Sequence, residues 1–516
     1  MNDNLKLIKV RGSWLLAISI LYIILPTVLF LLGWVEPFFS IPVVIGIFFF
    51  AVRCYKLSAK KDLIFTKDSF KALILCILLA LLWLSCSGIM GVVQQHEDYV
   101  VRNAIYQTLI RCDWPLIDSS GQHFIYYLAF WLPPAALCKL LHIQNVIACD
   151  VMLFIYIYVG IMLMLLHIWH LFAKYTVIFL FIVIFIGPAS GIVHWGSYLF
   201  PLDEITGAQL RVHAFPFYSA NCLTYQLFYT FHHTIIPWLF LAMLATNAIK
   251  SRFILFLSTF CVLVSPLASI GIFIVIVSKI WKNRERIQSY CTSYSLVVSF
   301  AVLFCAALYF TTSPGNNSVR FTWFESPFEH MENGGLKQAI LASCYFALNV
   351  IPIYFLFKKQ KNNYLLVSSI IILVSCFILY IGNSYGYNEY MFKCSTVCYF
   401  NIAIILTGIL KERKYSLRWF ALCGIYMTVA SLNSISALAK SGKTIAIHPD
   451  SMLNNMQDRW QGHLCHPADS YYYQFWSKDI NVCGSKLFIS ESGGASKCAT
   501  LFLVTGKTCI DDETSK

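Results

Sequence analysis

The sequence predicts an all-α polytopic integral membrane protein of about 13 transmembrane helices, followed by a small extracytoplasmic C-terminal α/β domain. Hydrophobic residues make up 58% and charged residues 12% of the 516 residues, whereas a soluble globular chain has roughly 45–50% and 25%. The mean hydropathy of +0.67 agrees with this class. Apolar runs near the ~20 residues that cross a bilayer recur along most of the chain, so a large soluble domain is excluded.

The apolar runs follow one another with short connections. The expected spans are 14–34, 37–53, 72–93, 145–166, 174–190, 233–248, 252–264, 266–281, 292–311, 339–357, 364–382, 394–410 and 417–436. The run 252–281 is apolar throughout and is interrupted by Ser265-Pro266, so it reads either as one span or as a hairpin of two.

The distribution of basic residues selects between these two readings. The net charge is +13, but Lys and Arg in a membrane chain collect in cytoplasmic loops and set topology, so no nucleic-acid partner is expected. Lys6, Lys9 and Arg11 place the N-terminus in the cytoplasm. A hairpin at 252–281 then keeps the later basic loops inside. These loops are 279–291, 358–361 and 411–418. We therefore expect a multi-pass protein of the cell membrane, a bacterial inner membrane, with an extracytoplasmic C-terminus.

Three parts are expected. Residues 1–71 form a two-span hairpin and a cytoplasmic loop. The first span of this hairpin is expected to be an uncleaved anchor, because the sequence after it lacks a small-residue cleavage site. Residues 72–436 form the transmembrane core, and residues 437–516 the outer domain. The main outer loops of the core are 94–144, 191–232 and 312–338. The apolar segment 124–141 would invert the topology as a span, so we expect an interfacial helix broken at Pro133-Pro134.

The C-terminal part changes composition and contains four cysteines. They are Cys465, Cys483, Cys498 and Cys509. In an extracytoplasmic segment this number predicts two disulfides, with three possible connectivities. His463-Leu464-Cys465-His466 is also compatible with the start of a zinc site. Disulfides are favoured because the remaining ligand pairs are not closely spaced.

The main candidate for chemistry is the acidic pair Glu97-Asp98, which directly follows the third span. A carboxylate at the membrane surface can deprotonate a hydroxyl or hold a divalent cation. Arg102 lies four residues after Asp98 and therefore on the same helix face. The alternative is an acidic helix N-terminus that complements the helix dipole.

Further candidates lie at the outer ends of other segments. His232 and His233 open a middle span, where the alternative is an interfacial anchor. Glu389 and Lys393 begin a late span, four residues apart, where the alternative is a helical ion pair. A later outer loop contributes the cation Arg320. An ionisable group inside a span usually faces a cavity or a partner; the expected span 145–166 contains one, Asp150.

The order of Glu97-Asp98, Asp113-Trp114-Pro115, Tyr126-Tyr127 and Leu132-Pro133-Pro134 resembles the first extracytoplasmic loop of GT-C glycosyltransferases. The resemblance covers roughly 72–440. The family usually places its acidic loop after the first span, whereas here it follows the third; an additional N-terminal hairpin accounts for this.

Bacterial polytopic proteins of the same type also have two later elements that this chain resembles. The corresponding residues are Gln226, His232-His233 and Pro237-Trp238 for the first, and Asn388 to Lys393 for the second. In the second element, this chain has Glu389 and Lys393 at the positions where the resembled proteins have Asp and Arg. The charge is kept, but Lys lacks the bidentate fork with which Arg binds phosphate.

The resemblance implies transfer of a sugar from a polyprenyl-phosphate donor to a glycan, lipid or protein acceptor at the outer face of the membrane. Asp98 would act as the base, and Glu97 would orient the acceptor or share a metal. The hydroxyl would attack with inversion through an oxocarbenium-like state, and cations would stabilise the leaving phosphate. Those candidates are Arg102, Arg320, Lys393, His232 and His233. Asp150 is a further binding candidate, and a divalent cation, Mg²⁺ or Mn²⁺, is left open.

Two other functions remain alternatives. An O-antigen-type polymerase or ligase tends to rely on Arg and His in large outer loops, but the later outer loops contain only Arg211 and Arg320 as arginines. A transporter or flippase of lipid-linked glycans often shows inverted repeats and interrupted spans, and no repeat is visible in the sequence.

Overall fold

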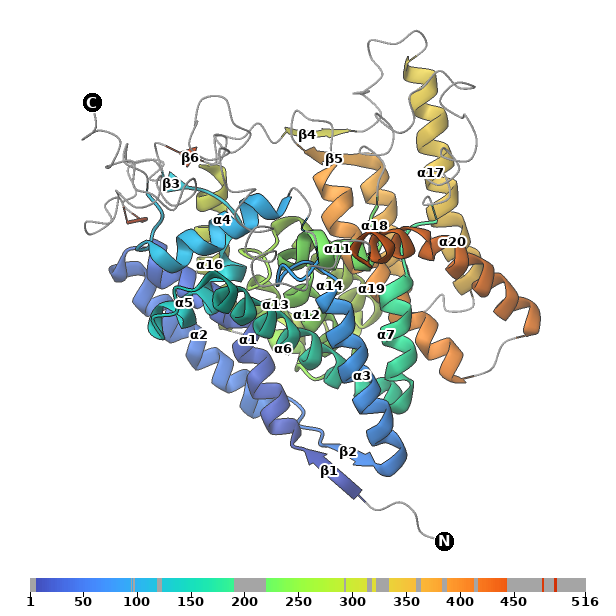
Figure 1. Cartoon of the computed structure of the whole chain (residues 1–516), viewed down its shortest axis with the longest axis horizontal. Coiled ribbons are helices and arrows are strands. Elements are labelled where there is room, and N and C mark those ends of the chain that lie inside the picture. Colours follow the sequence, from blue (N-terminus) through green and yellow to red (C-terminus); the bar gives the residue numbers. More distant parts are fainter. Residues whose placement is uncertain are drawn as a thin grey trace.

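The computed structural model describes most of the helical part of the chain. The described residues are 6–93, 95, 98–117, 123–189, 220–291, 294–312, 318–321, 334–358, 363–382, 388–412, 416–442, 476–477 and 487–489. These residues are mostly helical, with a few short strands (Figure 1). The structural statements below refer to these residues.

The N-terminal part is a helix hairpin closed by a short sheet. Its elements are β1 (Lys6–Val10), α1 (Gly12–Trp34), α2 (Pro37–Leu57), β2 (Leu63–Thr66) and α3 (Lys67–Ser85). α1 packs against α2, as the hairpin predicted over 14–53 requires. β1 pairs antiparallel with β2, and this sheet forms one tip of the molecule (Figure 1).

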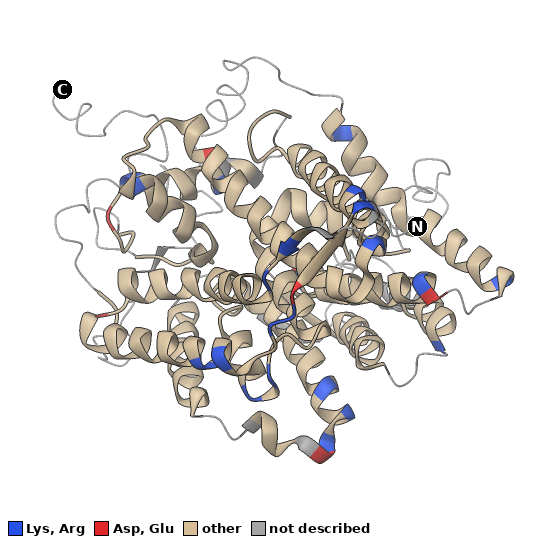
Figure 2. Ribbon diagram, turned by 90° about the horizontal axis from the view of Figure 1, so that it is seen from below, with Lys and Arg blue, Asp and Glu red and all other residues tan. Residues whose placement is uncertain are grey.

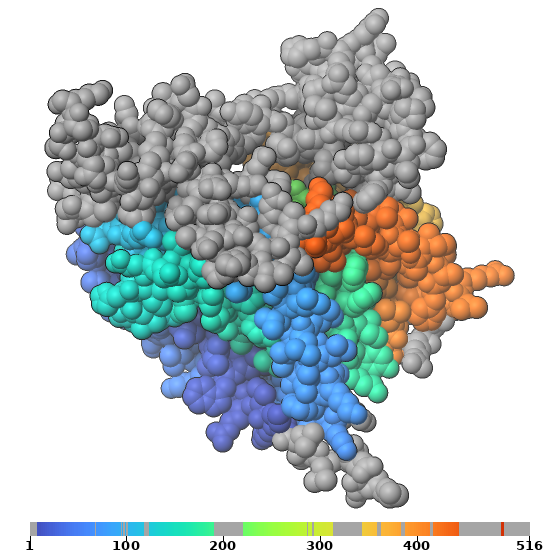
Figure 3. Space-filling view, in the orientation of Figure 1, coloured from blue at the N-terminus to red at the C-terminus, as the bar shows by residue number. Residues whose placement is uncertain are grey.

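The middle part contains α4 and α5, which match no predicted span, then one long apolar helix continued by a short one, and a bent helix pair. Its elements are α4 (Asp98–Arg111), β3 (His123–Phe124), η1 (Leu128–Trp131), α5 (Leu132–Leu140), α6 (Val146–Phe172), η2 (Ala173–Tyr175), α7 (Thr176–Phe185), α11 (Leu223–Thr230), η3 (Phe231–His233) and α12 (Ile235–Ala245). α3 packs against α7, and α7 against α20, so the three lie side by side on the face shown in Figure 3.

The last part surrounds one central helix, α19. The elements are η4 (Ser251–Phe253), α13 (Ile254–Thr259), α14 (Pro266–Lys282), η5 (Arg284–Arg286), α15 (Gln288–Cys291), α16 (Ser295–Thr311), β4 (Ser318–Phe321), α17 (Gly334–Phe357), α18 (Tyr364–Ile378), β5 (Leu379–Gly382), α19 (Glu389–Glu412), α20 (Leu417–Gly442) and β6 (Trp476–Ser477). α19 packs against α18, α14, α7, α11 and α12, and is buried over most of its length.

Several helices are long and apolar enough to cross a membrane. Five segments meet this criterion, and a sixth is the pair Leu223–His233 and Ile235–Ala245, which is bent by 104°. The five are α1, α2, the stretch 146–185, α19 and α20. The chain is therefore a helical, membrane-associated protein in its described part. Each of the thirteen predicted spans contains a helix, but thirteen crossings remain a prediction.

Two predicted segments differ in detail. The run 252–281 does break at Ser265-Pro266, because Pro266 begins α14; α13, with six residues, is only about 9 Å long and cannot cross a bilayer alone. The expected break of a helix at Pro133-Pro134 is wrong. Both prolines occupy the first turn of α5, where a missing N–H costs nothing, and the 128–135 stretch is buried.

Short parts of the C-terminal segment dock on the end of α1. Glu36 N donates to Leu487 O at 2.9 Å, and Ile489 N donates to Trp34 O at 3.1 Å. β6 also pairs with β3. Residues 476–477 and 487–489 thus lie at the end of the molecule opposite the β1–β2 sheet (Figure 1). The predicted disulfide residues lie outside the described residues. They are Cys465, Cys483, Cys498 and Cys509.

The first turn of α1 lies unusually close to the loop before β2. A Cβ on Gly12 would lie 2.1 Å from Lys61 O and 2.4 Å from Lys61 C. We expect Gly12→Ala to lower the free energy of unfolding by about 1–3 kcal/mol, because backbone atoms must move apart. Thermal or denaturant unfolding in detergent measures this. In the matched control Gly424→Ala, the new methyl group meets nothing within 4 Å, so unchanged or slightly higher stability is expected; equal effects in both would contradict the packing argument.

Asp62 ties the loop before β2 to both β1 and α1. Its Oδ2 lies 2.7 Å from Lys9 Nζ, and its Oδ1 accepts from Gly12 N at 2.9 Å. The hydrogen bond from Lys9, followed by that from Gly12, holds the pKa of Asp62 below its ordinary value. The stabilisation is therefore present at neutral pH and is lost as the pH falls below about 4, through the folded-state pKa.

We expect Asp62→Asn to lower the unfolding temperature at pH 7. The difference from wild type should shrink as the pH falls below about 4, because the wild-type carboxylate is then protonated as well. Parallel thermal scans at pH 7, 5 and 3 test this. A difference that stays constant down to pH 3 would show that the charge of Asp62 is irrelevant.

Candidate functional site

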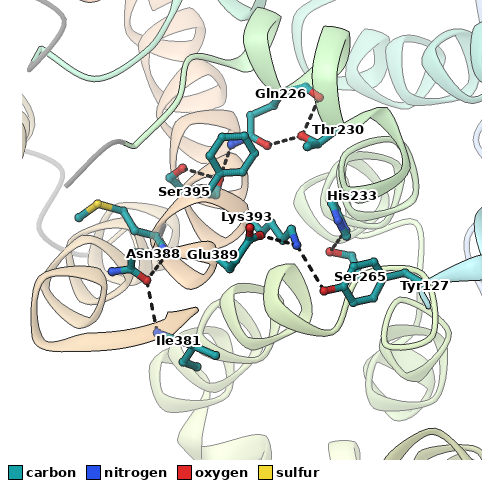
Figure 4. A network of polar contacts seen from close by, with 12 residues as sticks. Tyr127, Gln226, Thr230, His233, Ser265, Ile381, Asn388, Glu389, Lys393 and Ser395 are labelled. Atoms are coloured by element: carbon teal, nitrogen blue, oxygen red, sulfur yellow. Dashed lines mark hydrogen bonds and ion pairs between the residues drawn. The ribbon is translucent and has the colours of Figure 1, made fainter. Parts of the chain in front are cut away.

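Lys393 is a buried cation one turn into α19. Its Nζ lies 2.6 Å from Glu389 Oε2, and the exposed fractions of the two side chains are 8% and 28%. Nζ also lies 3.5 Å from the hydroxyl of Tyr127 and 4.7 Å from the centre of its ring. The helical ion pair weighed as an alternative therefore exists, but its cation is buried and faces an aromatic ring from another segment (Figure 4).

His232 and His233 lie at the 104° bend between α11 and α12. The short 3₁₀ turn buries both imidazoles. His233 Nδ1 lies 2.9 Å from Ser265 Oγ, just before α14 begins. The His233 ring meets Tyr127 edge-on, with ring centres 5.0 Å apart. Tyr127 thus contacts both His233 and Lys393 (Figure 4).

His232 is 1% exposed, and neither of its ring nitrogens has a hydrogen-bond partner among the described residues. Its ring centre lies 3.9 Å from that of His233 and 4.5 Å from that of Trp131. Trp131 Nε1 also has no hydrogen-bond partner within this part of the chain. Buried polar atoms are normally hydrogen-bonded. His232 and Trp131 are therefore suited to bind polar groups of a ligand.

Arg102, in the second turn of α4, adds a second cation. Its guanidinium carbon lies 5.4 Å from the centre of the Tyr99 ring. Tyr99 Oη lies 2.5 Å from Phe228 O and 2.7 Å from Ser87 O, so hydrogen bonds tie the start of α4 to α11. Arg102 and Lys393 both act electrostatically on the two imidazoles. Helices far apart in the sequence therefore bring these groups into one cluster.

Polar side chains of α11 hold α19 in position beside the bend. Gln226 Nε2 donates to Phe392 O, and Thr230 Oγ1 donates to Gln226 Oε1 at 2.8 Å. Asn388 Oδ1 accepts from Met391 N at 3.2 Å and so caps the start of α19. These bonds fix the helix turn that carries Lys393 (Figure 4).

We call this group the outer cationic cluster, after the side of the membrane that the sequence predicts for it. It consists of Arg102, Tyr127, Trp131, His232, His233, Ser265, Glu389 and Lys393. The sequence argument identified its charged residues and both histidines. It missed Tyr127, Trp131 and Ser265 as members, although the Tyr126-Tyr127 pair and the Ser265-Pro266 interruption are visible in the sequence.

The side chains of three predicted site residues are not described. Asp98 begins α4, but its side chain is not among those described, and Glu97 lies outside the described residues. Arg320 lies in β4, where it pairs with Tyr380 of β5 in the backbone register; its side chain is likewise not described. β5 packs against α19, so the strand that contains Arg320 is paired with a neighbour of the helix that begins at Glu389.

Asp150 belongs to a different group of side chains. It lies in the second turn of α6 and is 2% exposed, and its Oδ2 has no hydrogen-bond partner among the described residues. It interacts electrostatically with Tyr106 of α4 and with the thiols of Cys138 and Cys149. Tyr106 lies four residues after Arg102, so α4 connects the two groups.

The described residues contain no group of three or more His, Cys, Asp or Glu side chains suited to a metal ion. The carboxylates of Glu97 and Asp98 are not among the side chains considered. Binding of Mg²⁺ or Mn²⁺ by this pair therefore stays a prediction.

No family model, curated protein or solved structure matches the chain. The fold and the cluster define a helical membrane protein with buried cations, imidazoles and aromatic rings where distant segments meet.

Proposed function

We propose that the protein is a membrane glycosyltransferase of GT-C type, which moves a sugar from a polyprenyl-phosphate donor to an acceptor at the outer face of the membrane. The observation that carries the proposal is the outer cationic cluster. His232 and His233 of η3 and Lys393 of α19 all lie against Tyr127. Arg102 of α4 is close enough to act electrostatically on both imidazoles.

The charges of the cluster favour an anionic ligand. Among its described side chains, Arg102 and Lys393 are cationic and Glu389 is anionic, which leaves an excess of positive charge. Charge-assisted hydrogen bonds from such side chains to phosphate oxygens are strong. A phosphate diester of a lipid-linked sugar is an anion of this kind, and the same cations would stabilise the phosphate that leaves during transfer.

The sequence supplies the remaining part of the mechanism. Asp98 begins α4, one turn before Arg102. In the proposed reaction its carboxylate takes the proton of the acceptor hydroxyl as the oxygen attacks the anomeric carbon from the face opposite the phosphate. Aromatic rings such as Tyr127 and Trp131 offer surfaces on which a sugar can stack.

The proposed orientation has thirteen crossings, a cytoplasmic N-terminus and an extracytoplasmic C-terminal domain. Figure 2 supports it, because Lys and Arg outnumber Asp and Glu in the view from the side of the β1–β2 sheet. Basic residues on this side are typical of a cytoplasmic face. The docked parts of the tail lie at the other end.

Lipid analysis of a deletion strain tests this function. A transferase mutant should accumulate one polyprenyl-phosphate sugar that is accessible at the outer leaflet. An O-antigen-type polymerase or ligase mutant should accumulate finished lipid-linked oligosaccharide, and a flippase mutant should keep the lipid in the inner leaflet. Either of these outcomes, or an unchanged lipid profile, would contradict the proposal.

A further inference from the structure

α5 and α6 form a tight helical hairpin that brings two cysteines together. Cys138 lies near the end of α5 and Cys149 in the first turn of α6. Ile143 N donates to Cys138 O at 2.9 Å, and Asn145 Oδ1 accepts from Ala148 N at 3.0 Å. The turn is fixed at both ends, so the last turn of α5 lies beside the first turn of α6.

Cys138 and Cys149 lie beside one another. Both cysteines are free and fully buried in the structure, and Tyr106 and Ile143 each contact both of them. Tyr106 of α4 lies over the pair: its Oη is 3.6 Å from Cys138 Sγ and donates to Cys149 O at 2.9 Å. Cys149 Sγ lies 3.5 Å from Ile143 O. The pair is therefore held between three helices.

The carboxylate of Asp150 lies next to this pair and interacts electrostatically with both thiols. Its Oδ2 has no hydrogen-bond partner within the described part of the chain. Thiol oxidation begins with a thiolate, and a neighbouring carboxylate can accept the thiol proton. The group thus combines two adjacent thiols with a base.

We propose that Cys138 and Cys149 form a disulfide that joins α5 to α6 in the mature protein. The proposal uses the orientation in which this hairpin lies at the outer, oxidising side of the membrane. It does not depend on the transferase activity. It differs from the disulfides predicted from the sequence, which involve the four cysteines of the C-terminal part.

The bond forms by exchange with the disulfide of an oxidising protein. One thiolate attacks that disulfide and gives a mixed disulfide; the second thiolate then attacks the first sulfur and releases the oxidant. Two S–H bonds are lost and one S–S bond forms, and the oxidant takes up two electrons and two protons as it becomes a dithiol. Because both thiols are buried, exchange precedes the final packing of α5 on α6.

The disulfide would also restrict the position of Trp131, one of the aromatic residues of the outer cationic cluster. η1 directly precedes α5 and contains Trp131, whose ring contacts His232. Fixing α5 to α6 restricts the movement of this turn. Tyr106, which contacts both cysteines, is on the same helix as Arg102.

Differential thiol labelling of the full-length protein, purified from membranes, tests the proposal. The denatured protein is alkylated with iodoacetamide without reductant, then reduced and labelled with a second reagent before mass spectrometry. We expect Cys138 and Cys149 to take the second label and to appear as one linked peptide in the unreduced digest. Cys54 and Cys261, also buried, serve as internal controls and should take the first label.

Two variants complete the test. In Cys138→Ser, Cys149 should take the first label, because its partner is gone. In the double variant Cys138→Ala and Cys149→Ala, reductant should lower the unfolding temperature less than in the wild type, because only the disulfides predicted in the C-terminal part are left to reduce. First-label modification of both cysteines in wild type would overturn the proposal, and so would a peptide linking either one to Cys112.

Discussion

Lys393→Met is expected to lower the rate of sugar transfer about 100- to 1,000-fold, because a preorganised charge beside the leaving phosphate contributes this much to many reactions. Lys393 Nζ is held by Glu389 and by the ring of Tyr127, so no other side chain moves into its place without rearrangement. The assay follows sugar transfer in proteoliposomes. The donor is the polyprenyl-phosphate sugar that accumulates in the deletion strain.

Two further variants separate this role from a structural one. Lys393→Arg keeps the charge and should recover part of the rate. Lys411→Met, at the far end of the same helix, removes a lysine whose Nζ donates to Leu171 O, and it should leave the rate unchanged. If Lys393→Met retained the wild-type rate, the outer cationic cluster would not bind the phosphate of the donor.

Asp98→Asn is expected to lower the rate about 100- to 10,000-fold, the usual contribution of a general base. Asparagine keeps the size and the ability to accept a hydrogen bond, but it cannot take the proton of the attacking hydroxyl. Donor binding should be nearly unchanged, since the cations of the cluster remain. The same proteoliposome assay measures the rate, and retention of the radiolabelled donor measures binding.

The matched control is Asp113→Asn, which removes an exposed carboxylate from the same predicted outer loop. It should transfer sugar at the wild-type rate. An Asp98→Asn variant with normal activity would exclude base catalysis by this residue. This conclusion would hold whatever result the Lys393→Met variant gives. The lysine and aspartate variants thus test separate steps of the proposed reaction.

Hydropathy located the helices well but not their ends. The third predicted span extends to residue 93, whereas α3 ends at Ser85. Beyond it the chain turns at Gly88 and Gly91, both with positive φ, a conformation that glycine adopts without strain. Glycines of this kind occur within apolar runs, so composition alone does not show that the helix has ended. Hydropathy likewise does not show that α13 is only six residues long, because the residues after it are also apolar.

The candidate site was predictable where charge was informative. A buried ionisable residue in an apolar chain needs a partner, so Lys393 and Glu389 could be identified from their spacing. Contacts across helices could not be identified, because the approach of Tyr127 to Lys393 and to His233 depends on the bend between α11 and α12. For the same reason, the sequence did not reveal that Asp150 lies beside two thiols rather than beside the histidines.

The docking of the tail on the first helical hairpin has a consequence for biosynthesis. Backbone groups of Trp34 and Glu36 are hydrogen-bonded to residues 487–489, although more than four hundred residues separate them. The ribosome synthesises the N-terminal hairpin long before residues 487–489. The turn between α1 and α2 therefore lacks these hydrogen bonds until residues 487–489 have been made, and a chain truncated before residue 487 exposes a polar turn that a membrane quality-control protease can recognise.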